Sequence, residues 1–384
     1  MRKILLTLTV LGLATGFGAQ AAAAATRVVD NDRVECPNAQ FTTIQAGVTA
    51  AAPGDTVLVC PGTYPEQVTV PAGKDNVVVR SQVRLAAIIQ APATLAADVV
   101  NSKSIVRITV SRNVTLLDFV VTGPGPLGCD SIRAGVRVDG NASANILRNH
   151  ITEIRDTPFS GCQNGVAIQV GRRAEGQVGQ ALIAGNLIDR YQKNGPTVDN
   201  VGSRAVIVGN EIRGIGPTPI IAQNGIQVSR GAVAEVRANR VSDNTYSLAT
   251  AGLFSSAGIL LFEAGSGTRI SENRAFRNDD NLSVSATSGT LIDRNRFTDS
   301  TFYDGIFMGS DTSNNRIEKN HLNGNAEHDC HDDSVGAGTA GTANFWIKNS
   351  GVTENRPGLC KADKGDDDAD ENDDDDDENG DRDN

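Results

Sequence analysis

Aromatic residues, histidine and methionine are scarce in this chain of 384 residues. It has one Trp, four Tyr, eleven Phe, four His and two Met, so a core must be built from aliphatic side chains. Residues 363–384 carry 14 of the 46 acidic residues with two basic ones, and the remainder holds 33 basic and 32 acidic residues. A surplus of positive charge is therefore missing, which excludes an ordinary nucleic-acid-binding face. The composition, with 40 Gly, also excludes a coiled coil, collagen and a multi-span membrane protein.

The N-terminus has the features of a secretory signal peptide. Arg2 and Lys3 precede an apolar stretch that ends near Phe17, and an alanine run over 21–25 offers an Ala-x-Ala cleavage site. The apolar stretch is short for a membrane anchor, and no Cys stands at the cleavage point as a lipoprotein would require. We therefore expect residues 1–25 to be removed and the mature chain, without a membrane span, to be secreted or periplasmic.

The six cysteines fit an oxidising compartment. All lie in the mature chain, their number is even, and none forms a C-x-x-C pair. Pairing of sequence neighbours is the simplest connectivity, and free or metal-binding thiols are the alternative. The predicted disulfides are Cys36–Cys60, Cys129–Cys162 and Cys330–Cys360.

A short pattern recurs from about residue 146 to 322. It consists of an aliphatic residue, two variable residues, Asn, one variable residue and a second apolar residue. The pattern occurs seven times in a constant register, which indicates stacked repeats rather than isolated surface turns. The Asn positions are Asn149, Asn186, Asn210, Asn239, Asn273, Asn295 and Asn320.

The repeat unit is expected to be β, because apolar and β-branched residues alternate over short runs that Gly, Asn and Asp interrupt. Units of about 22 residues with two or three strands predict an all-β fold, a right-handed parallel β-helix of roughly 12 coils. The Asn side chains would then stack about 4.8 Å apart and bond one another as a ladder. We expect Asp118 to hold the ladder position one coil before Asn149.

A solenoid leaves an unpaired strand at each end and needs a cap. Phe41, Ile44 and Val48 would share one face of a short helix, with Thr42 or Thr43 as its N-cap. This helix is expected to cover the first coil.

The chain divides into segments accordingly. Residues 26–75 are the N-terminal cap and first coil, and 76–360 are the β-helix with a C-terminal cap around Trp346. Residues 361–384 form a polyacidic tail that is expected to be disordered, because its charges repel one another and it has almost no apolar residue. A solvated spacer is the default role of the tail, and weak binding of Ca²⁺ or of cationic surfaces is the alternative.

Two segments resemble a known family. The stretch FTTIQAGVTAAAPGDTVLVCPGTYPEQVTV (41–70) is similar to the N-terminal cap and first coil of the pectin-lyase-like superfamily of right-handed β-helix proteins. The segment DC…GTAGTANFW…GLC (329–360) is similar to the C-terminal end of many exported bacterial members. The resemblance covers about residues 30–360 and implies the fold, whereas its motifs are poor guides to activity.

The resemblance implies a family with polysaccharide lyases, glycosidases and pectin methylesterases, but their catalytic motifs are not found in this sequence. Gly62-x-Tyr64-x-Glu66 matches the first methylesterase motif, which is structural. The acid pair Asp279-Asp280 lacks the accompanying Gly-His-Gly and Arg-Ile-Lys of polygalacturonase-like enzymes. Neither a lyase Ca²⁺ segment nor the epimerase Asp-Pro-His-Asp is present. A divergent set of carboxylates from separate coils stays open.

The loop after each ladder Asn is the candidate ligand-binding region. Three of the four Tyr lie in it, accompanied by three Asp. Aromatic faces beside carboxylates suit a sugar-binding groove, and ordinary turn residues are the alternative. These candidates are Tyr191, Tyr246, Tyr303, Asp243, Asp299 and Asp304.

The segment His328-Asp-Cys-His331-Asp-Asp333 is the densest group of ligand-type residues. A soft-metal site would need a free Cys330, which the predicted disulfide removes. A Ca²⁺ contact through Asp332 and Asp333 is the alternative, and turn carboxylates are the default. We assign no metal and no cofactor.

Three functions follow from these observations. The favoured one is a secreted, non-catalytic β-helix that binds polysaccharide or another extended surface ligand. A divergent polysaccharide lyase or hydrolase would instead need at least two carboxylates and an Arg or Lys together on the loop face. A structural or adhesive surface protein would have a smooth outer wall without a groove.

Overall fold

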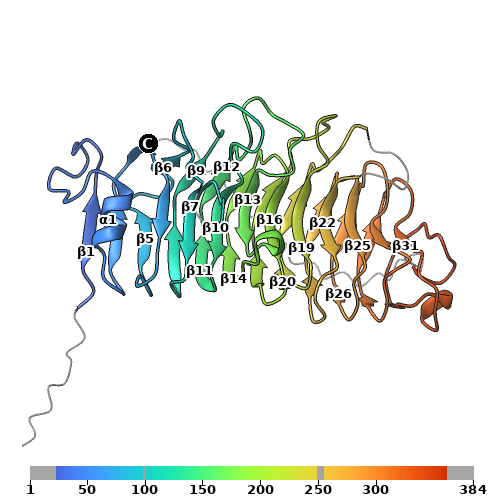
Figure 1. The fold of residues 1–384 in the computed structure, drawn as a ribbon. Coiled ribbons are helices and arrows are strands. Elements are labelled where there is room, and N and C mark those ends of the chain that lie inside the picture. The colour runs from blue at the N-terminus through green and yellow to red at the C-terminus, as the bar shows by residue number, and fades with distance from the viewer. Residues whose placement is uncertain (1–22, 98–99, 249–254, 361–384) are drawn as a thin grey trace, which may run out of the picture.

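Residues 23–97, 100–248 and 255–360 are described by the computed structural model of the chain (Figure 1). Within them the chain winds as the predicted right-handed parallel β-helix, with three long sheets along one axis. Most of the predicted signal peptide and the whole acidic tail lie outside the described residues. Among the described helices, none has both the length and the apolar character that crossing a membrane requires.

Each complete coil contributes one strand to each sheet in turn, and the twelve-stranded sheet has one more strand at either end. Sheet 1 has twelve strands: β1 (Thr26–Val29), β2 (Thr56–Val59), β5 (Val78–Ser81), β8 (Val114–Leu117), β11 (Ala142–Leu147), β14 (Gly179–Ala184), β17 (Arg204–Val208), β20 (Val233–Arg237), β23 (Arg269–Ser271), β26 (Leu291–Asp293), β29 (Arg316–Glu318) and β32 (Phe345–Ile347). Sheet 2 has ten: β3 (Gly62–Pro65), β6 (Ala87–Gln90), β9 (Val120–Thr122), β12 (His150–Thr152), β15 (Leu187–Asp189), β18 (Glu211–Arg213), β21 (Arg240–Ser242), β24 (Arg274–Phe276), β27 (Arg296–Thr298) and β30 (His321–Asn323). Sheet 3 also has ten: β4 (Val68–Val70), β7 (Ser104–Thr109), β10 (Ala134–Asp139), β13 (Val166–Val170), β16 (Asn194–Asp199), β19 (Asn224–Ser229), β22 (Ala257–Phe262), β25 (Asp280–Ser285), β28 (Ile306–Met308) and β31 (Cys330–Asp332).

The aliphatic position of the repeat forms a continuous stack inside sheet 1. Ile183 pairs with Ile207, and Ile207 pairs with Val236 in the next coil. All three are fully buried. Because most coils offer an aliphatic side chain at the same inward point, the apolar core is mainly aliphatic, with a few buried rings such as Phe119 and Phe297.

Replacing Ile207 by Ala is expected to lower the free energy of unfolding by about 2–5 kcal/mol, because the cavity would lie between two coils. Urea unfolding followed by circular dichroism measures this loss. Val201→Ala is the matched control, since Val201 is 71% exposed and its truncation should change little. A loss well under about 1 kcal/mol for Ile207→Ala would contradict the register described above.

The Asn side chains of the repeat stack in the turn between sheets 1 and 2. The side-chain oxygen of Asn239 accepts from the backbone N–H of Asn210 at 3.0 Å and from its Nδ2 at 2.9 Å. Nδ2 of Asn239 donates to the carbonyl of Ile207 at 2.8 Å. The stack continues one coil beyond the sequence pattern, because Asn320 donates to Asn349 at 2.9 Å. These bonds satisfy the buried polar groups of a turn that repeats in every coil.

The predicted ladder position of Asp118 is wrong by one residue. Leu116 pairs with Ile146, so Phe119 stands where the following coil has Asn149, and its backbone N–H donates to that Asn at 2.9 Å. Asp118 lies at the left-handed corner before it, with φ 64°, and forms an ion pair with Arg148 at 2.7 Å.

A short helix covers the first coil. Helix α1 (Ile44–Ala50) has Thr43 as its N-cap, and the carboxylate of Glu66 accepts from the N–H groups of Ile44 and Gln45 at 2.8 and 2.9 Å. Tyr64 is buried and donates its hydroxyl to a backbone carbonyl. The residues of the methylesterase-like motif are therefore structural: Glu66 fixes the capping helix and Tyr64 fills the first coil.

All three disulfides have the predicted pairing. Cys36–Cys60 lies beside the N-terminal cap, and Cys330–Cys360 closes the last coil. Cys129–Cys162 joins two neighbouring loops that run from sheet 2 to sheet 3. Since no cysteine is free, none is available as a thiolate ligand or nucleophile.

Candidate functional site

A groove lies on the outer face of sheet 3, over β13, β16 and β19. It has a volume of about 560 Å³, and the segment that follows β13, with the short helix η1 (Arg173–Glu175), lies along it. We call this feature the sheet 3 groove. Its lining residues are Gln163, Val166, Gln169, Arg172, Arg173, Ala174, Lys193, Asn194, Thr197, Asp199, Gln227 and Arg230.

The floor of the groove is polar and uncharged. Gln169, Thr197 and Gln227 pair across β13, β16 and β19, and the strand alternation that turns Val and Ile inward turns these three outward. Nδ2 of Asn194 donates to Thr197 at 3.0 Å and to Gln227 at 2.9 Å. Asn224 continues this row of hydrogen bonds by donating from its Nδ2 to Oδ1 of Asn194 at 3.1 Å. Amide and hydroxyl groups therefore form a row that can both donate and accept.

The walls of the groove are basic. Four of its lining residues are cationic and Asp199 is the acidic one, although the chain outside its tail is nearly neutral. Lys193 donates to the carbonyl of Ala222 at 2.7 Å, and burial lowers its pKa to about 8. Burial also lowers the pKa of Arg172, although a guanidinium stays charged at neutral pH.

The single acidic lining residue is largely neutralised. The carboxylate of Asp199 accepts from the hydroxyl of Ser229 at 2.9 Å and from Arg230 at 3.1 Å. Its other oxygen accepts from the backbone N–H of Arg173 at 2.8 Å. The three arginines of the groove also have acidic partners: Glu175, Glu263 and Asp199. An anion that enters the groove would therefore share these cations with carboxylates.

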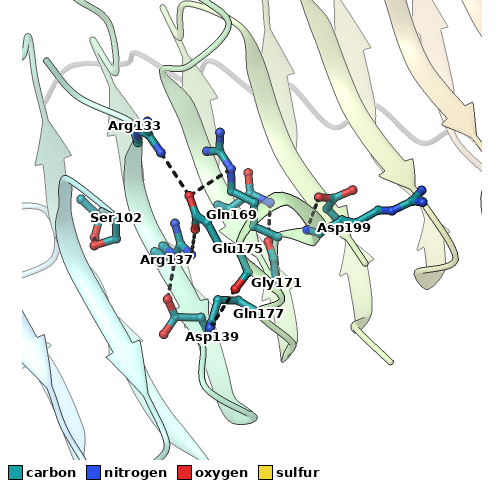
Figure 2. A network of polar contacts seen from close by, with 12 residues as sticks. Ser102, Arg133, Arg137, Asp139, Gln169, Gly171, Glu175, Gln177 and Asp199 are labelled. Atoms are coloured by element: carbon teal, nitrogen blue, oxygen red, sulfur yellow. Dashed lines mark hydrogen bonds and ion pairs between the residues drawn. The ribbon is translucent and has the colours of Figure 1, made fainter. Parts of the chain in front are cut away.

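A buried ion cluster holds η1 against the sheet (Figure 2). Glu175 accepts from three guanidinium groups: Arg133 at 3.1 Å, Arg172 at 3.3 Å, and Arg137. Arg137 is 1% exposed and also bonds Asp139 at 2.7 Å. Because one carboxylate on η1 binds three arginines, it fixes the wall from which Arg172 enters the groove.

A second polar cluster lies further along the same sheet. Leu282 of β25 pairs with Ile306 of β28, so Asp280 and Asp304 stand in neighbouring coils at the same register. Burial and the charge of Asp304 raise the pKa of Asp280 to about 8. The adjacent Asp279 has its pKa raised by burial as well. Asp280 is therefore a carboxyl that keeps its proton near neutral pH.

His331 also reaches this cluster. Its Nδ1 lies 3.0 Å from Oδ2 of Asp304, and its Nε2 lies 3.0 Å from Oδ1 of Asp333. Burial alone would lower the pKa of His331, but the two carboxylates outweigh it and raise the pKa to about 9.

The residues expected to bind sugar do not form one site. Tyr191 is fully buried and donates its hydroxyl to Asn244, so its ring offers no face to a ligand; this corrects the expectation for that residue. The loop between β15 and β16 is too short to project from the solenoid, so the ring of Tyr191 points into the core. Asp304 is likewise 1% exposed.

The other candidates lie near the surface but apart from the sheet 3 groove. Tyr246 lines a shallow pocket of about 190 Å³ with Phe302, and Tyr303 is half-buried beside it. Asp243 is occupied by a two-bond ion pair with Arg277, and Asp299 is exposed. These four residues stay candidates for a contact at the loop edge.

Sequence reasoning missed the groove because its residues come from three strands and four connecting segments. The outward Gln, Thr and Gln within otherwise aliphatic strands were the available indication. Their grouping with Arg172 and Lys193 depends on the register of sheet 3, which the ladder pattern between sheets 1 and 2 does not define.

The side chain of Asp332 points into the solenoid, whereas that of Asp333 points outward. The carboxylate of Asp332 is buried and accepts from Ser334 and from Nε1 of Trp346 at 2.8 Å. Asp333 lies outside, next to His331. The two carboxylates therefore do not meet around one Ca²⁺ ion.

Comparisons with known proteins agree on the fold. Residues 134–369 match the family of the right-handed beta helix region. A GH136 lacto-N-biosidase from Eubacterium ramulus superposes with a TM-score of 0.60 at 14% identity, covering 88% of this chain and 66% of that one. XylC in complex with xylose gives 0.53 at 14% identity, with 78% and 69% covered, and the pectate lyase Pel9A gives 0.50 at 12%, with 71% and 76% covered.

No curated protein matches the sequence significantly. The family match covers more than half of the chain, and the sheet topology, the capping helix and the solved structures agree with it. The chain therefore belongs to the family of right-handed parallel β-helix proteins.

Proposed function

We propose that the protein is exported and binds an acidic polysaccharide in the sheet 3 groove. The observation that carries the proposal is the combination of a polar amide floor with four cationic side chains, on a chain that is nearly neutral outside its tail. Guanidinium groups bind carboxylates and sulfates through paired hydrogen bonds, and amides suit sugar hydroxyls. The signal-peptide pattern and the three disulfides support export.

The groove favours charged over neutral glycans. None of its lining residues is aromatic, so it offers no ring on which a sugar can stack. Binding would then depend on ionic and amide contacts and should weaken with salt, because partly exposed charges are screened. The named neighbours, a lacto-N-biosidase, a pectate lyase and XylC bound to xylose, are compatible with a glycan ligand.

A glycan screen of the purified mature protein tests the proposal, with polyuronates, sulfated glycans and neutral glucans as ligands. The screen should follow both binding and the release of new reducing or unsaturated ends. Saturable, salt-sensitive binding of an acidic polymer without products supports the proposal. Equal binding of neutral polymers, or no binding at all, contradicts it.

The affinity for a polyuronate is expected to fall about three- to tenfold between pH 7 and pH 9.5. The pKa of Lys193 is lowered to about 8, so its positive charge is lost over this range while the arginines stay charged. Lys193→Arg should remove the pH dependence and retain the binding. Fluorescence titration at constant ionic strength measures both; a pH dependence that persists in Lys193→Arg would show that another group is responsible.

A further inference from the structure

We propose that Asp304, His328 and His331 form a binding site for a divalent transition-metal ion of the zinc type. This inference is independent of the sheet 3 groove and of the ligand proposed for it. The three side chains come from two neighbouring coils at the C-terminal part of sheet 3. Their ligand atoms lie within 4.8 Å of one another.

The strand register brings these residues together. Ile306 of β28 pairs with Cys330 of β31, which places Asp304 opposite His328, two residues before each paired position. His331 follows Cys330 on the outer face. The disulfide from Cys330 and the inward carboxylate of Asp332 hold β31 in place, so the two imidazoles are presented from a fixed strand.

The distances suit a shared ion. Nδ1 of His328 lies 3.3 Å from Oδ1 of Asp304, and Nδ1 of His331 lies 3.0 Å from Oδ2. Ligands bound tetrahedrally at about 2.0–2.1 Å from zinc are separated by about 3.3 Å. The two imidazole rings are 5.0 Å apart and nearly perpendicular, which allows both nitrogens to face one point.

A bound ion would replace the direct contacts of both Nδ1 atoms with Asp304, and these contacts are poorly directed as hydrogen bonds. Both Nδ1 atoms are buried and close to Asp304, yet neither makes a well-directed hydrogen bond within the described structure. The backbone N–H of His328 donates to Oδ1 of Asp304 at 3.0 Å and so fixes the carboxylate.

The outer nitrogen of His331 has the partner that a metal-bound histidine needs. Its Nε2 lies 3.0 Å from Oδ1 of Asp333. Metal-binding histidines commonly donate their second ring N–H to a carboxylate, which orients the ring and strengthens the ligand. Asp333 therefore has a positioning role at this site and is not itself a ligand.

The type of ion follows from the ligands. Two imidazoles and one carboxylate suit zinc and similar transition ions, whereas Ca²⁺ takes oxygen ligands. Three protein ligands leave a fourth position for water. The side chains of His328 and His331 are 26% and 14% exposed, so an ion can enter from solvent.

Calorimetric titration of the full mature chain with Zn²⁺ after removal of metals tests the site. We expect one tight equivalent, with affinity at least 30-fold lower in His328→Ala and His331→Ala and about tenfold lower in Asp333→Asn. Cu²⁺ used as a probe should show nitrogen ligands by electron paramagnetic resonance. The acidic tail has no His or Cys, so it cannot produce that signature.

Matched controls come from the two other histidines. His150→Ala and His321→Ala remove imidazoles that contact Asp189 and Ser350, and both variants should bind Zn²⁺ like the parent. Circular dichroism of the metal-free variants shows whether each remains folded, and His331→Gln serves where His331→Ala does not. Absence of a tight equivalent, oxygen-only ligands, or unchanged affinity in both His328 and His331 variants would overturn the proposal.

Discussion

Replacing Arg173 and Arg230 together by Ala is expected to weaken polyuronate binding roughly 100-fold or more. Each arginine can make charge-assisted hydrogen bonds to a ligand carboxylate, worth about 1.5–3 kcal/mol apiece. Loss of Arg230 also removes the cation that bonds Asp199 at 3.1 Å and leaves that carboxylate to repel an anion. Both arginines are partly exposed, with side chains 60% and 39% accessible, so the fold should tolerate the change.

Isothermal titration at two salt concentrations measures this effect. The salt dependence of the double variant should be shallower than that of the parent, because fewer ion contacts form. Arg213→Ala with Arg294→Ala is the matched control, since these arginines are similarly exposed and paired but lie away from sheet 3. If the control loses as much affinity as the test variant, binding follows the overall charge and not the groove.

The sequence predicted the architecture because a solenoid repeats local rules. The ladder Asn, the aliphatic residue before it and the apolar residue after it recur in seven successive coils, so the same local pattern indicates the same turn each time. The exception at Asp118 has a local cause. Corner positions of this chain adopt positive φ in coil after coil, and an acidic residue tolerates that corner about as well as the ladder position.

The site was harder to predict because it depends on which residues lie side by side across coils. Loop lengths differ, so distance from a ladder Asn does not decide whether a side chain points outward. Tyr191 shows this: its short loop forces the ring into the core, whereas Tyr246 on a longer loop stays near the surface. The cationic residues of the groove are ordinary in composition and become a site only when strands align.

The histidine cluster could be predicted in part from the sequence, unlike the groove. The sequence identified His328 and His331 as ligand-type residues, and it identified Asp304 separately as a loop carboxylate. Only the pairing of β28 with β31 joins them. It also separates Asp332 from Asp333, which sequence proximity had suggested as partners.

Glu175→Ala is expected to lower the free energy of unfolding by about 3–5 kcal/mol, because removal of one partner leaves buried charge uncompensated. Three guanidinium groups contact this carboxylate, and Arg137 is 1% exposed. Glu263→Ala is the matched control. Its carboxylate pairs with Arg173 at 3.1 Å in a 43% exposed position, so the loss should be under about 0.5 kcal/mol.

A second variant separates the stabilising role of the cluster from its role in shaping the groove. Glu175→Ala combined with Arg137→Met removes the buried guanidinium, and Asp139 keeps its contact with Arg107 at 3.0 Å. Stability should recover in large part, since replacing buried ion pairs by apolar side chains is often neutral or favourable. Polyuronate binding should stay weaker than in the parent, because Arg172 has lost its partner on η1. The helix then keeps the bond from the N–H of Arg173 to Asp199, but not its ion contacts with sheet 3. Recovery of both properties would mean that the wall of the groove does not depend on Glu175, and the buried cluster would then be explained by folding alone.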